Sequence, residues 1–517
     1  MIDRSLTPLF IHPSDLAVQT EIRLPLPLVV GNRDYAQREA LLRRMDALLI
    51  SSGIEAGFLA SVVQQAIDES IPLRAPLTDR RRERVQEYAR QSLRCTVARI
   101  LSNESHRKFS CHLAESPLLQ WFCRTADMDT RVQVPSKSTL QRMESEVPIA
   151  VLASAHALLL NTSVAVSPDN GTSLLGLVEP VDLSVIWVDS TCMQLDIHYP
   201  TDWVLLRDAT RTIMKAILTI RAHGLKHRME APEAFIAAMN AQCMAMSGSS
   251  RRGRGAEKKK ERKRVLRAMK RLVGKVRQHG KRYRDLLLTC RKETDLSVAQ
   301  AQLIVDRIDN VLTQLPAAIS QAHERIIGGR AVPNDDKILS LYEPHARTYV
   351  RGKSGADVEF GLQLLVSESA EGLIVDCHLV PDRIAHDTTL LMPAIARMRT
   401  LYGDTVAKTV VTDRGFTSAA NDAALEKLAI INGTLPREPD DLKERLQDPI
   451  HRKLHKRRAQ TEARIGVFKN DFIGGHLPTK GFEQQQRYIA WAALAHNLWV
   501  LARREYVGST SELARAS

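Results

Sequence analysis

The stretch VEFGLQLLVSESAEGLIVDCHLV, Val358–Val380, decides the fold class of this 517-residue chain. Its first part alternates apolar with polar or small residues, as a half-buried strand does. A turn-like segment at residues 367–372 then leads into the apolar run LIVDCHLV, so we predict a hairpin of two antiparallel strands. The fold therefore contains a sheet.

Two further apolar runs on either side of the hairpin each end in an aspartate. They are SVIWVD, Ser184–Asp189, and KTVVTD, Lys408–Asp413, and both are typical of buried strands. A fifth strand is predicted at residues 429–433, and helices are predicted after residue 387, at 418–428 and at 455–472. Strands that alternate with helices in this way predict a mixed α/β class.

Composition favours an intracellular partner of negative charge. Lys and Arg number 73 against 59 Asp and Glu, a net charge of +14, which favours nucleic acid or an acidic membrane surface. No apolar run approaches the roughly 20 residues of a membrane span, and the start MIDRSLTPLFIHPSD lacks the layout of a signal peptide. The seven cysteines form no C-x-x-C pair, so we interpret them as reduced packing residues of a cytoplasmic protein.

The positive charge is local. Residues 251–284 hold 17 Lys or Arg against 2 Glu, a net +15 that exceeds the charge of the whole chain. The same segment carries apolar residues at helical spacing, from Val265 to Val276, which predicts an amphipathic basic helix. It lies in an almost wholly helical stretch of about 130 residues. A solvated helix face is the alternative, but we favour phosphate binding, with Lys258, Lys259, Lys260 and Arg264 as contacts.

The first 150 residues are predicted to form short helices. A break at Ser116-Pro117 separates two of them, and Pro135 followed by Ser and Thr predicts a capped helix that carries Lys137, Gln141 and Arg142. Short helices that end in a polar, basic helix fit a helix-turn-helix DNA-binding region, in which Lys137 and Arg142 contact DNA. A small helical bundle with solvated charges is the alternative interpretation.

Three carboxylates lie where a metal-dependent phosphoryl-transfer enzyme needs them. Asp189 and Asp413 each end a predicted strand, and parallel neighbouring strands would bring both to one edge of the sheet, where open α/β sheets build sites. Glu462 lies on the last predicted helix. Carboxylate oxygens suit Mg²⁺ or Mn²⁺, and two such ions can stabilise the attacking and leaving oxygens of a phosphodiester.

The last predicted helix carries a polar stripe. His455, Arg458, Glu462 and Lys469 are spaced by three, four and seven residues, so they fall on one face of a helix. Most such stripes are salt-bridged solvent faces. This stripe would also place a metal ligand between cations that suit neighbouring phosphates.

These motifs together resemble the DDE transposases of bacterial insertion sequences, which share the RNase H-like fold with retroviral integrases. The spacing of His455, Arg458, Glu462 and Lys469 is that of a Tyr-Arg-Glu-Lys signature, with His in the Tyr position. The blocks VDSTCMQLDIHYPTDWVLLRDATR, VEFGLQL, VVTDRGF and SPLLQWF followed by PSKSTLQR are similar to further blocks of such enzymes. The resemblance covers about residues 88–504.

The resemblance implies roles for particular residues. Asp189, Asp413 and Glu462 would be the catalytic metal ligands, for Mg²⁺ or substituting Mn²⁺. Arg458 and Lys469 would contact DNA, and the Tyr-to-His change leaves open which contact His455 makes. Double-stranded DNA, at element ends and in the target, would be the partner of a homodimer in the bacterial nucleoid, with no membrane involved.

The sequence thus predicts a helical DNA-binding region at residues 1–150 and an RNase H-like catalytic domain at 181–210 and 335–505. A basic helical insertion at 211–334 interrupts the catalytic domain. The predicted reaction is cleavage of phosphodiester bonds at element ends and joining of the 3′ hydroxyl to target DNA. An inactive transposase-derived DNA-binding protein and a nuclease on the same fold are the alternatives. A P-loop at residues 351–354 and a zinc helix at His451 and His455 are disfavoured, because the required Gly and Glu are missing.

Overall fold

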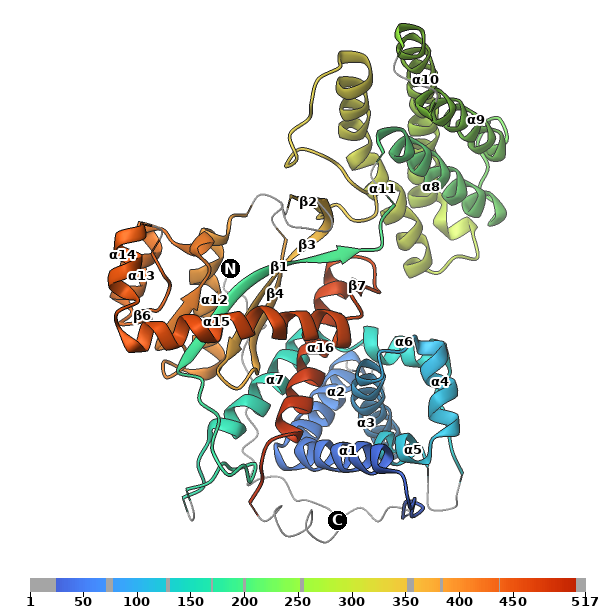
Figure 1. The fold of residues 1–517 in the computed structure, drawn as a ribbon. Helices are drawn as coiled ribbons and strands as arrows, with labels where there is room; N and C mark the ends of the chain where they lie inside the picture. Colours follow the sequence, from blue (N-terminus) through green and yellow to red (C-terminus); the bar gives the residue numbers. More distant parts are fainter. Residues whose placement is uncertain are drawn as a thin grey trace.

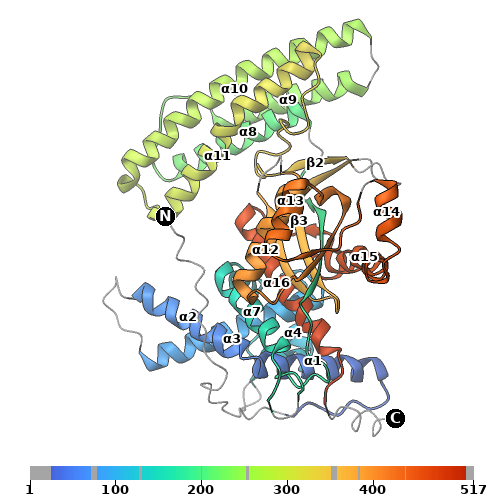
Figure 2. The same cartoon turned by 90° about the vertical axis from the view of Figure 1, so that its left-hand side faces the viewer.

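The computed structural model describes residues 25–70, 78–126, 131–168, 171–198, 201–251, 255–350, 358–381, 385–436 and 438–507. A mixed sheet with flanking helices forms the centre of the molecule (Figure 1). A group of helices from the N-terminal part lies against one end of this centre, and a bundle of long helices stands off the other end (Figures 1 and 2). The P-loop-like residues 351–354 lie outside the described residues.

The sheet has the strand order β2-β3-β1-β5-β6, with β4 paired to β3 and β7 paired to β1. Its strands are β1 Val185–Leu195, β2 Arg347–Val350, β3 Val358–Ser369, β4 Ile374–Val380, β5 Thr409–Thr412, β6 Ile431–Asn432 and β7 His476–Leu477. β1 runs antiparallel to β3 and parallel to β5, and β3 and β4 form the predicted antiparallel hairpin. The predicted mixed α/β class is confirmed, and the sheet is consistent with an RNase H-like domain.

Gly361 allows β3 to cross β1 closely. A Cβ atom at this position would lie 2.0 Å from the carbonyl oxygen of Met193 on β1. Every other residue type would therefore push the two strands apart. The glycine thus helps to keep β1 in register with β3 beyond the point where β1 leaves β5.

Helices cover both faces of the sheet. They are α12 Asp387–Tyr402, α13 Ala419–Lys427, α14 Pro439–Arg445, α15 Pro449–Val467 and α16 Phe482–Ala502, with short turns η5 Arg414–Phe416 and η6 Phe468–Phe472. Because side chains alternate along a strand, Trp187 of β1 packs against Leu454 of α15, whereas Ile186 and Val188 join the main core. α15 and the main core therefore lie on opposite faces of β1.

The N-terminal helices share that main core. They are α1 Arg33–Ser51, α2 Ile54–Ser70, α3 Asp79–Leu101, α4 His106–Glu115, α5 Pro117–Cys123, α6 Lys137–Ser145 and α7 Ile149–Val164. Ser136 caps α6, as predicted, by accepting a hydrogen bond from the backbone N–H of Thr139. At the predicted break, Ser116 caps α5 in the same way through the N–H of Leu119. α16 packs against α1, α3 and α7 as well as β4, so one buried cluster joins the N-terminal helices to the sheet.

A buried polar network fixes this junction. The side chain of Asn497 in α16 exchanges hydrogen bonds with the backbone of Ile374 in β4 and donates to Nε2 of His156 in α7, at 2.8 Å. Nδ1 of His156 lies 3.2 Å from the hydroxyl of Tyr402 in α12. Burial lowers the pKa of His156 to about 4, so the imidazole is neutral in the folded protein. The network ties α7, α12, α16 and β4 together.

The stretch between β1 and β2 folds as a helical unit with its own core. Its helices are α8 Asp202–Ala222, α9 Pro232–Arg251, α10 Ala256–Cys290 and α11 Val298–Ala322, followed by the π-helical turn η4 His323–Gly328. The apolar face predicted for the basic helix is confirmed, because Val265, Met269 and Val276 of α10 are buried in this second core. Figure 2 shows the unit standing apart from the sheet.

Among the described residues, no single helix is long and apolar enough to cross a membrane. Two bent helix pairs meet that test only when each pair is taken together: Arg33–Ser51 with Ile54–Asp68, and Lys137–Ser145 with Ile149–Val164.

Candidate active site

The two aspartates lie side by side because their strands are parallel neighbours. Val188 of β1 pairs with Thr412 of β5, and Asp189 and Asp413 are the next residues in each chain segment. The predicted adjacency of the two strands is confirmed. The expectation that Asp189 ends its strand is wrong, since β1 continues to Leu195 through its antiparallel pairing with β3.

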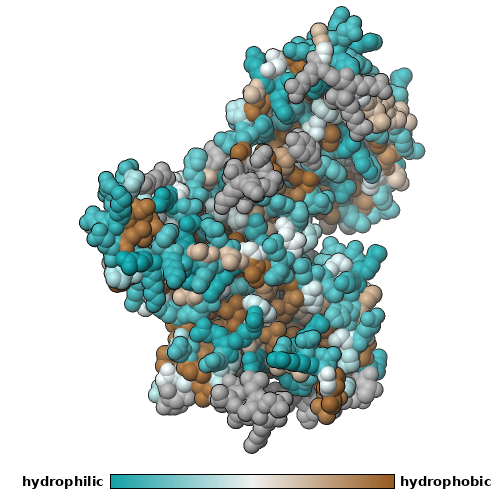
Figure 3. Space-filling model, in the orientation of Figure 1, coloured by the Kyte–Doolittle hydropathy of each residue, from teal (hydrophilic) through white to brown (hydrophobic). Residues whose placement is uncertain are grey.

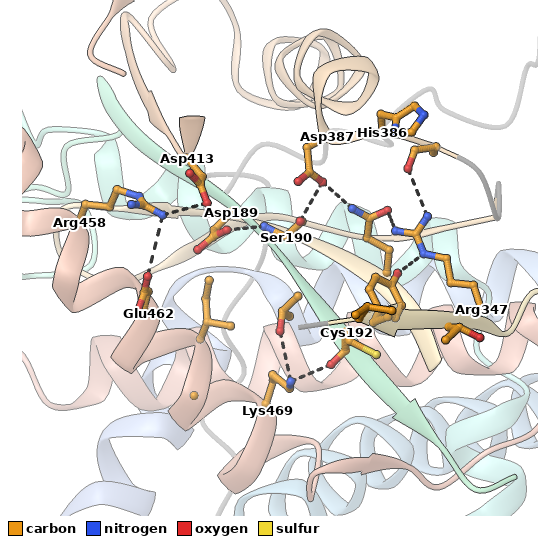
Figure 4. A pocket seen from close by; sticks show the side chains of 18 of the residues that line it. Asp189, Ser190, Cys192, Arg347, His386, Asp387, Asp413, Arg458, Glu462 and Lys469 are labelled. Carbon is orange, nitrogen blue, oxygen red and sulfur yellow. Dashed lines mark hydrogen bonds and ion pairs between the residues drawn. The ribbon is translucent and has the colours of Figure 1, made fainter. Parts of the chain in front are cut away.

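Glu462 and Arg458 reach the aspartates from α15. Nη2 of Arg458 lies 3.5 Å from Oδ2 of Asp413 and 3.9 Å from Oε1 of Glu462. The guanidinium thus lies between two carboxylates, and Figure 4 shows both of them beside Asp189. The stripe predicted on this helix therefore turns its Arg and Glu toward Asp189 and Asp413.

These side chains line one cavity of about 670 Å³. It brings together five of the residues singled out in the sequence: Asp189, Asp413, Arg458, Glu462 and Lys469. Its opposite side is formed by residues of β2, β3 and the start of α12 (Figure 4). A polar cavity of this size with one acidic end and several cations is able to hold a segment of a polyanion.

Asp189 is the most perturbed carboxyl group of the cavity. Burial raises its pKa to about 6, and the nearby carboxylates of Asp413 and Glu462 add to the rise. The backbone N–H of Ser190, which donates to Oδ1 of Asp189 at 2.8 Å, and the Arg458 guanidinium act in the opposite direction. Burial, more than the neighbouring charges, thus makes this carboxyl group easier to protonate.

Lys469 lies in the cavity but is bound to the protein. Its Nζ donates to the carbonyl oxygen of Cys192 at 2.7 Å and to the hydroxyl of Thr191 at 3.2 Å, both in β1. The residue belongs to the π-helical turn η6, in which the helix widens after α15. Lys469 therefore approaches the sheet along β1 rather than beside Glu462.

The other predicted DNA contacts lie away from the cavity. His455 is exposed on α15 and is not among the residues that line the cavity. Lys137 and Arg142 lie exposed on α6, and Lys259, Lys260 and Arg264 lie exposed on α10, beside the partly buried Lys258. The structure thus separates the predicted binding residues into three places.

Asp387 is a fourth carboxylate of the cavity, at the position where the sequence predicts only the start of a helix. One of its oxygens accepts hydrogen bonds from the hydroxyl of Ser190, at 2.9 Å, and from Nε2 of Gln363, at 2.6 Å. Its other oxygen lies 3.2 Å from where a Cβ of Gly415 would be. Asp387 therefore touches the segments that follow both Asp189 and Asp413. The adjacent pair His386-Asp387 before an apolar helix is the only sequence signal of this role.

Beside Asp387, the cavity is lined by further side chains that the sequence did not indicate as site residues. Gln363 of β3 accepts a hydrogen bond from Arg347 of β2, and the Arg347 guanidinium also binds the hydroxyl of Tyr349 and the carbonyl of Ala385. The guanidinium of Arg347 lies 4.5 Å from the ring centre of Tyr349. These contacts hold in place the side of the cavity that lies opposite its acidic end.

Arg457 holds α15 onto the sheet. Its guanidinium pairs with the buried Glu368 of β3 at 3.0 Å and donates to the carbonyls of Ser369 and Ala370. It also lies 4.7 Å from the ring centre of Trp187 in β1. Because Arg457 precedes Arg458 and lies one turn before Glu462, this anchor sets the position of both.

The donors at the acidic end fit a hard divalent cation. Carboxylate oxygens are the ligands that Mg²⁺ and Mn²⁺ prefer, and Asp189, Asp413 and Glu462 supply them. In the part of the chain that the structure describes, no three acidic, His or Cys side chains already converge closely enough to hold a metal ion. The side chain of Glu462 is 61% exposed, so it is free to close on an ion that the two aspartates hold.

Comparison with known proteins supports this interpretation of the site. Residues 330–498 match the family model described as the transposase DDE domain. The matched range includes Asp413 and Glu462 but begins after Asp189, which the helices α8–α11 separate from the rest of the site. No curated protein and no solved structure matches the chain. Residues 330–498 of this chain therefore belong to the transposase DDE domain family.

Proposed function

We propose that this protein is a DNA transposase that cuts phosphodiester bonds at the ends of a mobile element and joins the freed 3′ hydroxyl to target DNA. The observation that carries the proposal is the convergence of Asp189, Asp413 and Glu462 at one end of a polar cavity, with Arg458 between two of them. The family match over residues 330–498 supports the same activity class.

Asp189, Asp413 and Glu462 are the residues that would hold Mg²⁺, or Mn²⁺ in its place. Proteins with this domain generally use divalent metal ions. Bound there, such ions supply Lewis-acid stabilisation of the negative charge that develops on the phosphodiester. A divalent cation would offset the cost of burying the Asp189 carboxylate, which is the main cause of its raised pKa.

The cations of the cavity position the DNA. Arg458 lies beside the carboxylates, where its guanidinium can bind a non-bridging oxygen of the phosphate. Lys469 lies beside β1, where its ammonium group compensates the charge of an adjacent phosphate. Water and a 3′ hydroxyl are similar nucleophiles, so one site serves both cleavage and joining.

The remaining contacts belong to the proposal as well. α6 exposes Lys137, Gln141 and Arg142 on one side and buries Leu140 and Met143 on the other, as a helix that reads DNA would. We infer that the N-terminal helices recognise the element end and that two copies act on DNA. The boundaries at residues 150, 210 and 335 between binding region, catalytic domain and insertion stay predictions.

Strand cleavage of a labelled element-end duplex tests the proposal. We expect the wild-type protein to nick the duplex with Mg²⁺ or Mn²⁺ and only to bind it with Ca²⁺. Asp189→Asn, Asp413→Asn and Glu462→Gln keep the side-chain shape but remove a charged ligand, so each is expected to abolish nicking and to preserve DNA binding. Wild-type cleavage by any one of these variants would remove that carboxylate from the site. Nicking without joining would identify a nuclease instead.

A further inference from the structure

The long helix α10 carries a row of cations on its solvent face. Its members are all exposed and recur every three, four or seven residues: Lys260, Arg264, Arg267, Arg271, Lys275 and Arg282. At about 100° per residue they fall within an arc of about 80°. The buried residues of α10, such as Met269 and Val276, lie on the opposite side of the helix.

These cations lack acidic partners within the structure. None of the six takes part in an ion pair among the described residues, whereas Arg284, just beyond the row, pairs with Asp285 and Asp309. The neighbouring helix α9 contributes a single acidic residue, Glu233, to the whole of its length. In Figure 3 hydrophilic residues predominate over this unit at the upper right of the molecule.

Repulsion between the like charges of the row destabilises α10. Like charges three or four residues apart on a helix destabilise it, and the row contains four such pairs from Lys260 to Lys275. A polyanion along the row removes this repulsion. Amide residues at the same exposed positions would serve a solvated helix equally well without that repulsion.

The dimensions of the row match duplex DNA. From Lys260 to Arg282 the helix rises about 33 Å, close to the roughly 34 Å of one turn of B-DNA. We propose that this cationic row binds the phosphate backbones of double-stranded DNA over about one helical turn, outside the catalytic cavity and without reading the sequence. Lys and Arg on one straight helix supply charge along the duplex, as contacts to phosphate require.

The second core argues against insertion of α10 into a membrane surface. A helix that lies in a bilayer surface must bury its apolar face among the lipids. The apolar face of α10 is already packed against α8, α9 and α11. Figure 2 shows α10 along the outer side of the unit. The six side chains of the row are exposed, so a duplex has access to them.

The test replaces all six residues of the row by Gln in the full-length protein. Because each phosphate contact contributes about 0.9 to the slope of log K against log salt, we expect the slope to fall by about 3–5. The loss should be the same on an element-end duplex and on a random duplex. The melting temperature should stay unchanged or rise, since the variant relieves repulsion within α10.

A matched control neutralises six exposed cations outside α10 and the N-terminal helices: Lys226, Arg228, Lys408, Lys427, Lys480 and Arg503. The control should change the slope by less than 1. An unchanged slope in the row variant, or binding of the wild-type protein to anionic vesicles that competes with DNA, would overturn the inference. The inference rests on the proposed function, but the two fail separately: absent nicking by the wild-type protein refutes the transposase, and a normal salt slope in the row variant refutes the row.

Discussion

The hydroxyl of Ser190 donates a hydrogen bond to Asp387, while the backbone N–H of the same serine donates to Asp189. One residue thus connects the first aspartate of the proposed site to a carboxylate at the start of α12. Partners of this kind orient metal ligands and restrict their motion. The position of Asp189 is therefore set by α12 as well as by the sheet.

Asp387→Asn should slow strand cleavage about 10- to 100-fold, as loss of a supporting partner of a metal site does. An asparagine keeps the oxygen that accepts from Ser190 and Gln363 but loses the negative charge, so both hydrogen bonds become weaker. The apparent affinity for DNA should not change. Ser190→Ala should give a similar loss, and the double variant should lose little more. Asp404→Asn at the exposed end of α12 is the control; a normal rate for Asp387→Asn would refute the role.

Arg458→Ala is expected to bind divalent ions more tightly and to cleave more slowly. The guanidinium lies within 3.9 Å of Glu462 and 3.5 Å of Asp413, so it competes with a cation for their charge. Calorimetric titration with Ca²⁺ should show an affinity higher by about tenfold, equivalent to roughly 1.4 kcal/mol. Nicking rates should fall because a phosphate contact is lost. Unchanged Ca²⁺ affinity would show that Arg458 does not balance these carboxylates.

Arg457→Met should lower the free energy of unfolding by about 3 kcal/mol, because Glu368 would be left buried and unpaired. The double variant Arg457→Met, Glu368→Leu should recover most of this stability, since no buried charge remains. Cleavage should stay slow in both variants because α15 loses its bonds to the carbonyls of Ser369 and Ala370. Thermal melting and nicking rates measure the two effects. If the stable double variant is fully active, Arg457 stabilises the fold but is not needed to position Arg458 and Glu462 for cleavage.

Acidification should destabilise the fold through two buried histidines. Burial lowers the pKa of His156 and of His496 to about 4, so the unfolded chain takes up protons first as the pH falls below 6.5. Stability is thus lost between about pH 6.5 and pH 4. Each histidine should cost about 2 kcal/mol between pH 7 and pH 5. Urea unfolding of His156→Gln should show a shallower pH dependence than the wild-type protein, and the exposed His476→Gln should not.

Arg142→Ala should weaken binding to a specific element end by about 1–3 kcal/mol and binding to random DNA by much less. Its side chain is exposed on α6, which Ser136 caps. Competition between the two duplexes in a mobility-shift assay measures the difference. Arg81→Ala, at the exposed start of α3, serves as the control. Equal losses on both duplexes would mean that α6 does not read bases.

The sequence predicted those parts of the fold that follow from the spacing of apolar residues within one segment. Alternation predicted the β3–β4 hairpin, and the two apolar runs before Asp189 and Asp413 predicted neighbouring parallel strands. α16 was not predicted, because it is apolar around most of its circumference and presents no single face to count. β2 and β7, with 4 and 2 residues, exist only through pairing with longer strands.

In the site, too, residues on one helix were predicted from their spacing, whereas those positioned by distant contacts were not. The spacing of Arg458 and Glu462 on one helix predicted that they face the same way, and they line one cavity. The role of Asp387 depends on contacts with Ser190 and Gln363, 197 and 24 residues away, which no spacing reveals. Lys469 shifts along β1 because η6 widens the helix, a change in helical period that residue types alone do not encode.

The insertion of α8–α11 between β1 and β2 determines when the site is assembled during synthesis. Asp189 leaves the ribosome long before its partner Val366 in β3, with the whole helical unit in between. Trp491 and Asn497 of α16 complete the core on which both the sheet and the N-terminal helices rest. Domains form as their segments emerge, so the helical unit can fold first while the carboxylates stay apart. Under the proposed function, a nascent chain thus carries the helices proposed to bind DNA before it has a centre that cuts, and the ability to break DNA arises only after α16 has been made.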